Sequence, residues 1–205
     1  MRNNNVIKNL KTSSILNRVG LSKLTLLFAF ILFSISANAQ LVDVKGSELK
    51  WTGKKVTGEH FGKIAIKNAK LKVENDKITS GLFVIDMNSI TCDDIADKET
   101  NTKLIGHLKS DDFFGVEKFP ESKLVITSSS KFVGGKAEVQ ADLTIKGKTL
   151  PVSFTVVKSI GFYSAAITVN RAKYEIKYGS GSFFDSLGDN MIYDDFTLDV
   201  KLKVQ

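Results

Sequence analysis

One short stretch, Leu104–Ser122, holds the residue types most able to do chemistry in this chain. It reads LIGHLKSDDFFGVEKFPES, so His107 is followed closely by Asp111 and Asp112. A histidine beside a carboxylate can act as a general base that the carboxylate orients. Such a pair still needs a nucleophile or an oxyanion site, and the sequence contains no G-x-S-x-G or comparable motif. We therefore predict that the protein is not an enzyme and has no catalytic residue. An enzyme that uses His107 is the weakest of the hypotheses.

Residues that could bind a metal are sparse. The chain has two histidines, His60 and His107, which could share a metal only if the fold placed them together with a carboxylate. One group of acids lacks the spacing and central glycine of an EF-hand loop, and we expect it to be solvated: Asp93, Asp94, Asp97 and Glu99. The single cysteine, Cys92, cannot form an internal disulfide, and the neighbouring acids oppose a reactive thiolate. The sequence predicts an inert Cys92, no metal site and no cofactor.

The N-terminal residues 1–39 have the pattern of a targeting segment. The first 23 residues carry five cations and no acid: Arg2, Lys8, Lys11, Arg18 and Lys23. The apolar run LTLLFAFILFSISA follows, and then ANAQ. This order predicts a secretory signal peptide that is cleaved after Ala39. The apolar run is shorter than the roughly 20 residues of a typical membrane span, so we expect no stable span after cleavage; an uncleaved anchor is the alternative.

Removal of that segment changes the charge of the protein. The whole chain has a net charge of +7, and loss of the five N-terminal cations leaves about +2. No stripe of lysines and arginines remains to follow a phosphate backbone, so we predict no nucleic-acid partner. Residues 40–205 contain no repeat, linker or low-complexity tract, which indicates one domain with a substantial core.

Period-two alternation dominates this domain. In Ala137–Ile145, AEVQADLTI, every second residue is apolar, and FTLDVKLKV near the C-terminus repeats the pattern. Such alternation is typical of strands with one face on an apolar interior and the other in water. Turn signals such as END at Glu74 and KGK at Lys146 separate the runs. Short strands with brief loops predict an all-β antiparallel fold, and the pattern alone leaves barrel and sandwich open.

Two long connections interrupt the strands. In the first, TNTKLIGHLKS places Leu104, Ile105 and Leu108 at helical spacing, with Thr100 or Asn101 available as the N-cap. The second, GSGSFFDSLGDNMIYDD, is rich in glycine, serine and aspartate and carries a second phenylalanine pair. In a β-domain whose other loops are short, functional residues usually lie in the long loops.

Several segments resemble the YceI-like family. GHLKSDDFFGVEKFPES is similar to the family's L-x-S-x-D-F-F stretch, ADLTIKGKTLPVSFTV to its L-T-I-K-G hairpin, and VNRAKYEIKYG with YDDFTLDVKL to its closing strands. The resemblance covers residues 41–205 and implies a lipocalin-like antiparallel β-barrel of about eight strands, with a short helix in one long connection, over residues 40–205. It also implies a periplasmic protein (secreted if the cell has no outer membrane) that encloses a polyisoprenoid or similar amphiphilic lipid.

This resemblance suggests where the ligand would lie. We predict an apolar lining formed by Trp51, Phe83, Phe114, Phe154 and Phe162. Polar groups at the mouth would provide specificity, and the candidates are Lys54, His107 and Arg171. Arg171 could pair with a phosphate head group or form a buried structural ion pair. The alternative function is a packed envelope barrel that acts through protein–protein contacts, for example in a stress response. Monomer and homodimer are both left open.

Overall fold

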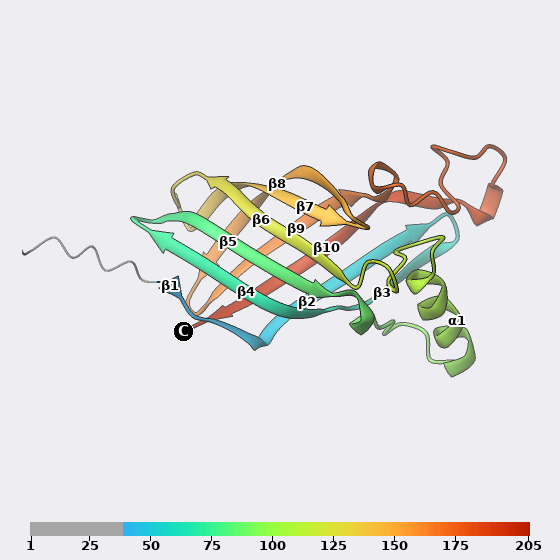
Figure 1. The fold of residues 1–205 in the computed structure, drawn as a ribbon, viewed down its shortest axis with the longest axis horizontal. Coiled ribbons are helices and arrows are strands. Elements are labelled where there is room, and N and C mark those ends of the chain that lie inside the picture. Colours follow the sequence, from blue (N-terminus) through green and yellow to red (C-terminus); the bar gives the residue numbers. More distant parts are fainter. Residues whose placement is uncertain (1–38) are drawn as a thin grey trace, which may run out of the picture. The chain divides into compact units, whose positions relative to one another are not determined.

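The computed structural model describes residues 39–205 (Figure 1). The predicted signal peptide lies outside the described residues, apart from its last residue, Ala39. The strands are β1 (Ala39–Gln40), β2 (Val42–Lys55), β3 (Gly58–Lys63), β4 (Ala65–Glu74), β5 (Lys77–Asp86), β6 (Glu121–Ser129), β7 (Lys136–Ile145), β8 (Lys148–Ser159), β9 (Phe162–Asn170) and β10 (Ile192–Val204). The helices are α1 (Lys98–Lys109) and the short 3-10 helices η1 (Met87–Ser89), η2 (Arg171–Tyr174) and η3 (Gly188–Asn190).

The strands form one antiparallel sheet that closes on itself. Their order is β1-β4-β5-β6-β7-β8-β9-β10-β2-β3. Only Leu41 separates β1 from β2, and only Ile64 separates β3 from β4. Because β3 pairs with β2 while β4 pairs with β1, the two ends of the sheet meet. Counting each interrupted strand once gives eight positions around a barrel, which confirms the predicted fold class.

Tight turns join the strands where the sequence predicts them. Asn75 and Asp76, between β4 and β5, have φ values of 50° and 56°. Lys146 and Gly147, between β7 and β8, have φ values of 51° and 76°. Positive φ at both central residues is the backbone of a type I′ hairpin, whose twist matches that of the flanking strands. These turns hold the long strands in register around the barrel.

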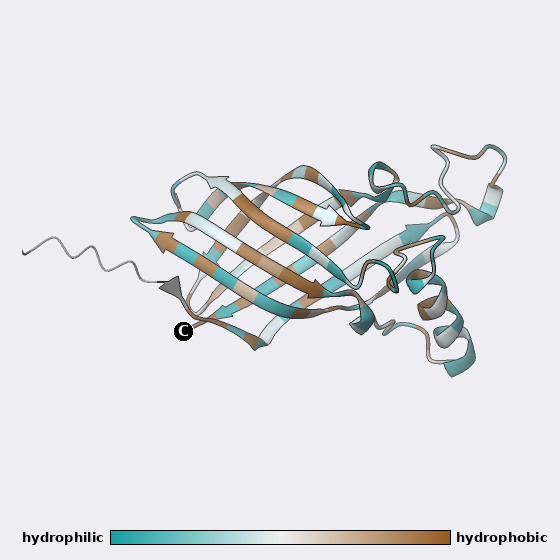
Figure 2. Cartoon of the chain, in the orientation of Figure 1, coloured by the Kyte–Doolittle hydropathy of each residue, from teal (hydrophilic) through white to brown (hydrophobic). Residues whose placement is uncertain are grey.

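Hydrophobic and hydrophilic residues alternate along the strands (Figure 2), and the hydrophobic ones form the buried core. In β7 the predicted inward set is buried throughout: Ala137, Val139, Ala141, Leu143 and Ile145. In β10 the inward Leu198 and Val200 are only half-buried, although they pack against the core. Both line open space inside the barrel, which explains their residual exposure. The interior is therefore not completely filled by side chains.

The wall is least regular between β8 and β9. These strands share only three ladder pairs, which join Val157–Ser159 to Phe162–Ser164. The chain after β9 turns through η2 and returns toward β7, where the Tyr174 hydroxyl donates to the Leu143 carbonyl oxygen (3.3 Å). Tyr174 and the following Ile176 are buried. This segment therefore adds apolar side chains to the core where the β8–β9 ladder is missing.

Helix α1 lies at one end of the barrel (Figure 1). Leu108 is buried and Leu104 and Ile105 pack against the core, as their spacing predicts. The predicted N-cap was wrong: Asp97 caps the helix by accepting the Thr100 N–H (2.9 Å). Asn101 instead donates its amide to two carbonyl oxygens in the preceding loop. A carboxylate one turn earlier satisfies the free N–H groups, which leaves Asn101 to hold the loop.

A search for membrane-spanning helices among residues 39–205 finds none with the required length and apolarity.

Candidate functional site: the barrel interior and its helix-covered end

The first cavity lies inside the barrel and has a volume of about 90 Å³. Its lining comes from eight strands and is almost wholly apolar. The lining residues are Leu49, Ile66, Leu71, Ile78, Phe83, Ile85, Leu124, Ile126, Leu143, Phe154, Val156, Tyr163, Ser164, Ala165, Ile167, Leu198, Val200 and Leu202. A cavity of this kind excludes water and accepts hydrocarbon, as engineered apolar cavities of about 150 Å³ do for benzene.

The second cavity has a volume of about 110 Å³ and lies beside α1 and the loops that follow it. Its lining mixes aromatic, aliphatic and basic side chains. The lining residues are Trp51, Gly53, Lys54, Lys55, His60, Ile64, Ile90, Leu104, His107, Leu108, Phe113, Phe114, Arg171, Ile192, Tyr193 and Phe196. The surface of this cavity is also almost wholly apolar, but polar and basic residues stand around it, whereas the first cavity has almost none in its lining.

The two cavities follow one another along the same strands. On β2, Leu49 lines the first cavity and Trp51, the next inward residue, lines the second. On β10, Leu198 and Phe196 show the same succession. Side chains two residues apart on a strand point to the same face and lie roughly 7 Å apart along it. The cavities therefore lie one after the other inside the barrel, and we refer to the two together as the bore.

Four of the five predicted lining residues face this bore. Phe83 and Phe154 line the first cavity, and Trp51 and Phe114 line the second. Trp51 is also anchored, because its indole N–H donates to the Thr91 carbonyl oxygen (2.9 Å).

The prediction for Phe162 was wrong. Phe162 lines neither cavity, and the Lys201 ammonium lies 4.4 Å from its ring centroid. The adjacent Tyr163 is buried and takes the inward position. Neighbouring residues of a strand face opposite sides, so only one of two adjacent aromatic residues can line the bore. The sequence could not tell which of the two it would be.

His107, the histidine of Leu104–Ser122, lines the second cavity. Its ring lies against Tyr178 (4.3 Å between centroids) and Phe113 (5.6 Å). Its Nε2 atom is buried and has no hydrogen-bond partner. The nearby Asp111 does not orient it, because that carboxylate pairs with Lys118 (2.6 Å). The arrangement leaves one ring nitrogen free for a bound molecule and provides no catalytic dyad with Asp111.

Arg171 lines the same cavity but is only 2% exposed. Its Nε donates to the Tyr193 carbonyl oxygen (3.2 Å). The other three hydrogen bonds go to the carbonyl oxygens of Ile176 (3.0 Å), Tyr178 (2.8 Å) and Ile192 (2.9 Å). Its Nη2 also lies 3.5 Å from Asp194 Oδ1. Burial lowers the pKa of Arg171, and the Asp194 charge opposes that shift. The guanidinium thus uses its donors to hold the chain between η2 and β10.

Lys54, the third predicted polar residue, lies at the rim of the second cavity and is largely exposed. Its ammonium is 3.7 Å from Glu59 Oε2 in the facing strand. An exposed ion pair of this length is weak and can exchange for a ligand charge at little cost.

The structure also brings together three residues that sequence reasoning kept apart: His60, Cys92 and Asp94. His60 Nδ1 lies 2.8 Å from Asp94 Oδ2, and the Cys92 thiol donates to Asp94 Oδ1 (3.2 Å). Partial burial opposes ionisation of Asp94, but hydrogen bonds from the Phe61 N–H, His60 and Cys92 outweigh it and lower its pKa to about 2. Burial and the Asp94 hydrogen bond raise the pKa of the Cys92 thiol. No sequence motif signals this cluster, because 31 residues separate His60 from Cys92.

The family assignment follows from the extent of the match to known proteins. The YceI-like domain matches residues 41–204, almost all of the part that the structure describes. This chain belongs to the YceI-like family.

Relatives of known sequence and structure agree with this assignment. A UPF0312 protein of Shewanella denitrificans is 29% identical over 86 residues, which is 42% of each chain, so the match spans less than half of that curated relative. The BcnA structure from Burkholderia cenocepacia has a TM-score of 0.57 at 23% identity and covers 79% of this chain and 98% of that one. A structure from Saccharophagus degradans, described as a polyisoprenoid binding domain, has a TM-score of 0.53 at 16% identity and covers 82% and 98%. At these identities the structural likeness shows the shared fold.

Proposed function

We propose that this protein is an exported carrier that encloses a long apolar ligand, a polyisoprenoid or a similar amphiphilic lipid, in its barrel. The observation that carries the proposal is the pair of cavities that follow one another along the bore. The predicted signal peptide and the structural neighbour described as a polyisoprenoid binding domain support it. A periplasmic location follows from the same signal peptide if the cell has an outer membrane.

The apolar lining provides the affinity in this proposal. Burial of apolar surface is worth about 25 cal/mol per Å², so a chain of several isoprene units gains a large favourable term inside the bore. The ordering of a flexible chain offsets part of that gain. The lining requires only a hydrocarbon of suitable width, which favours a class of lipids over a single compound.

The second cavity would receive the polar end of the ligand. His107 lines it, its buried Nε2 has no hydrogen-bond partner within the described residues, and an imidazole nitrogen suits a hydroxyl or carbonyl oxygen. Lys54 at the rim could pair with an anionic head group. Arg171 is left out of this proposal, because backbone carbonyl oxygens and Asp194 already occupy its donors.

The test uses two adjacent alanines on β9. Ala165 lines the first cavity, whereas Ala166 is exposed on the opposite face. Ala165→Trp fills the bore, and Ala166→Trp places the same bulk outside. We expect lipid extraction and mass spectrometry of the purified mature protein to show an amphiphile in the parent and in Ala166→Trp. Ala165→Trp should lose it and should fail to bind added polyprenol. Equal binding by both variants, or no binding by the parent, would overturn the proposal.

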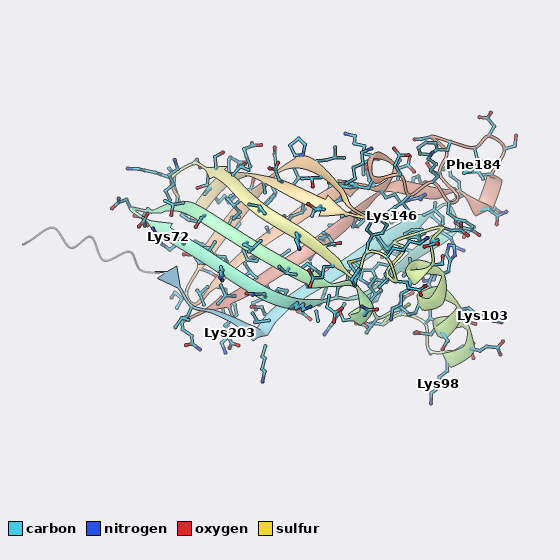
Figure 3. The ribbon with its side chains drawn as sticks, viewed as in Figure 1. Lys72, Lys98, Lys103, Lys146, Phe184 and Lys203 are labelled. Atoms are coloured by element: carbon cyan, nitrogen blue, oxygen red, sulfur yellow. The ribbon has the colours of Figure 1, made fainter. Side chains whose placement is uncertain are left out.

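A second candidate function is binding to another envelope protein. Phe183 and Phe184 are 43% and 50% exposed, and Phe184 lies at the same barrel end as Lys103 of α1 (Figure 3). Exposed aromatic pairs of this kind occur at protein interfaces. Crosslinking in cells should give a defined adduct that Phe183→Ser/Phe184→Ser abolishes while lipid binding persists. Adducts that survive the double substitution would exclude this loop as the interface.

A further inference from the structure

The His60, Cys92 and Asp94 side chains form a compact set of metal-binding atoms. One imidazole nitrogen, one sulfur and one carboxylate oxygen all lie within 4.8 Å of one another. His60 comes from β3, and the other two come from the loop between η1 and α1. In the described residues these atoms contact one another through the hydrogen bonds at Asp94.

Backbone pairing fixes the position of this loop. The Thr91 N–H donates to the Lys63 carbonyl oxygen (2.9 Å), and the Asp93 N–H donates to the Phe61 carbonyl oxygen (2.8 Å). The loop therefore runs along β3 as an extra extended segment. A side chain at Gly62 would overlap the Thr91 carbonyl group, so glycine permits this close approach. Because the main chain holds both segments, the three donors are positioned without a ligand.

The surroundings supply further support for the donors. Asp94 Oδ1 accepts the Phe61 N–H (2.9 Å), which orients the carboxylate and leaves Oδ2 directed at His60. Asn101 of α1 donates to the Cys92 carbonyl oxygen (2.8 Å), which fixes the cysteine backbone. Hydrogen bonds of this kind behind the ligands are typical of metal sites and raise their affinity. Cys92 is buried, whereas His60 has a side chain that is 34% exposed, so a cation could enter from the His60 side.

We propose that His60 Nδ1, Cys92 Sγ and Asp94 Oδ2 bind a divalent cation of zinc type in a site with one open coordination position. Nitrogen, sulfur and oxygen donors together suit Zn²⁺ and disfavour Mg²⁺ and Ca²⁺, which prefer oxygen alone. Tetrahedral Zn²⁺ with bonds of about 2.0–2.3 Å holds its ligands roughly 3.3–3.8 Å apart, so each donor needs to move by about an ångström or less. This departs from the sequence-based expectation that the chain has no metal site.

Protons and charges balance when the divalent cation binds. Cys92 releases its thiol proton to solvent and binds as the thiolate. His60 donates from Nδ1 to Asp94 without a metal, so on binding it must lose that proton to solvent and carry a proton on Nε2, which leaves Nδ1 free for the cation. One thiolate and one carboxylate neutralise the two positive charges of the cation. A water molecule would complete the four-coordinate shell, which is the arrangement of zinc sites that keep an exchangeable position.

The test uses the mature protein, stripped of metal and kept reduced, with Co²⁺ and Zn²⁺ as probes. We expect one Co²⁺ per chain with the absorption of a tetrahedral site and a sulfur-to-cobalt charge-transfer band. Zn²⁺ should displace the Co²⁺ and protect Cys92 from alkylation. His60→Ala and Cys92→Ser should each weaken binding by at least about 100-fold, since each removes one of three ligands.

Matched controls come from the same chain. His107→Ala removes the other histidine, and Asp93→Asn changes the carboxylate next to Asp94; both should bind Co²⁺ as the parent does. Circular dichroism and urea denaturation establish that each variant is folded. The proposal would be overturned if the parent failed to bind Co²⁺ or if binding survived both His60→Ala and Cys92→Ser. The cluster would then serve only to fix the loop through hydrogen bonds. Neither result depends on whether the barrel carries lipid.

Discussion

The two ends of the bore are built in different ways. The first cavity is lined by strands, and its residues follow the period-two alternation with little polar content. The second is lined partly by α1 and by loops, and its lining residues include His60, His107 and Arg171, although the surface that they present to the cavity is almost wholly apolar. Regular strands position a surface of uniform character, while irregular segments can bring single polar groups to one point. In the proposed function, the strand-lined part would provide affinity for hydrocarbon, and the residues around the second cavity would provide selectivity for a head group.

The largest loss of stability is expected beside the second cavity, where α1 and loops form part of the lining. Arg171→Met removes a buried cation whose hydrogen bonds reach four carbonyl oxygens, and it leaves Asp194 without its partner. We expect a loss of about 3–5 kcal/mol in the free energy of unfolding, measured by urea denaturation. Arg171→Lys keeps the charge but not the planar set of donors and should recover only part of the loss. A loss below about 1 kcal/mol for Arg171→Met would contradict the structural role.

A matched pair of isoleucines compares the packed end with the hollow bore. Ile176 is fully buried and lines neither cavity, whereas Ile167 lines the first cavity. Truncation to alanine costs about 2–5 kcal/mol in protein cores, and the cost rises with the volume of the cavity that results. We expect Ile176→Ala near the upper part of that range. Ile167→Ala, which only enlarges an existing space, should fall near the lower part. Equal costs in thermal or urea unfolding would argue against a hollow bore.

Tyr174 tests the segment that returns toward β7. Burial raises its pKa, so the folded protein keeps the hydroxyl proton at a pH where the unfolded chain has lost it. This contribution to stability is fully present below the unfolded pKa of about 10 and is lost as the pH rises through the folded value. Tyr174→Phe should cost about 1 kcal/mol at neutral pH, because the hydrogen bond to Leu143 is lost. The variant should also lose less stability than the parent between about pH 9 and 11. Parallel pH profiles would contradict the burial argument.

The smallest change in stability is expected at an exposed ion pair within Leu104–Ser122. Asp111 and Lys118 are 2.6 Å apart, but both side chains are mostly in water. Exposed ion pairs contribute little to stability and are screened by salt. Lys118→Ala should leave the urea midpoint within experimental error, and added salt should not change the comparison. A clear loss of stability would show that this loop is packed more tightly than its exposure indicates.

Particular residues show how far sequence reasoning reached. The inward set of β7 and the tight turns at Asn75 and Lys146 were predicted, because alternation and turn chemistry are local properties. The sequence analysis named Phe162 as a lining residue, whereas the register of β9 turns the neighbouring Tyr163 toward the first cavity. The helix was predicted but its N-cap was not, because several polar residues near its start could serve.

The polar groups of the helix-covered end could not be predicted in the same way. Whether Arg171 binds a phosphate or the backbone depends on four carbonyl oxygens from Ile176, Tyr178, Ile192 and Tyr193. The contact between His60 and Asp94 depends on a loop that pairs with β3. Both arise from residues that are distant along the chain.

The amino-acid sequence alone determined that this chain forms an antiparallel β-structure with an apolar inside, because side-chain period and turn type are set by neighbouring residues. Only the tertiary structure decided that the inside is hollow, that Arg171 holds a loop and that His60, Cys92 and Asp94 meet. Each of those outcomes depends on how long-range contacts fill or leave space, and no local pattern encodes that.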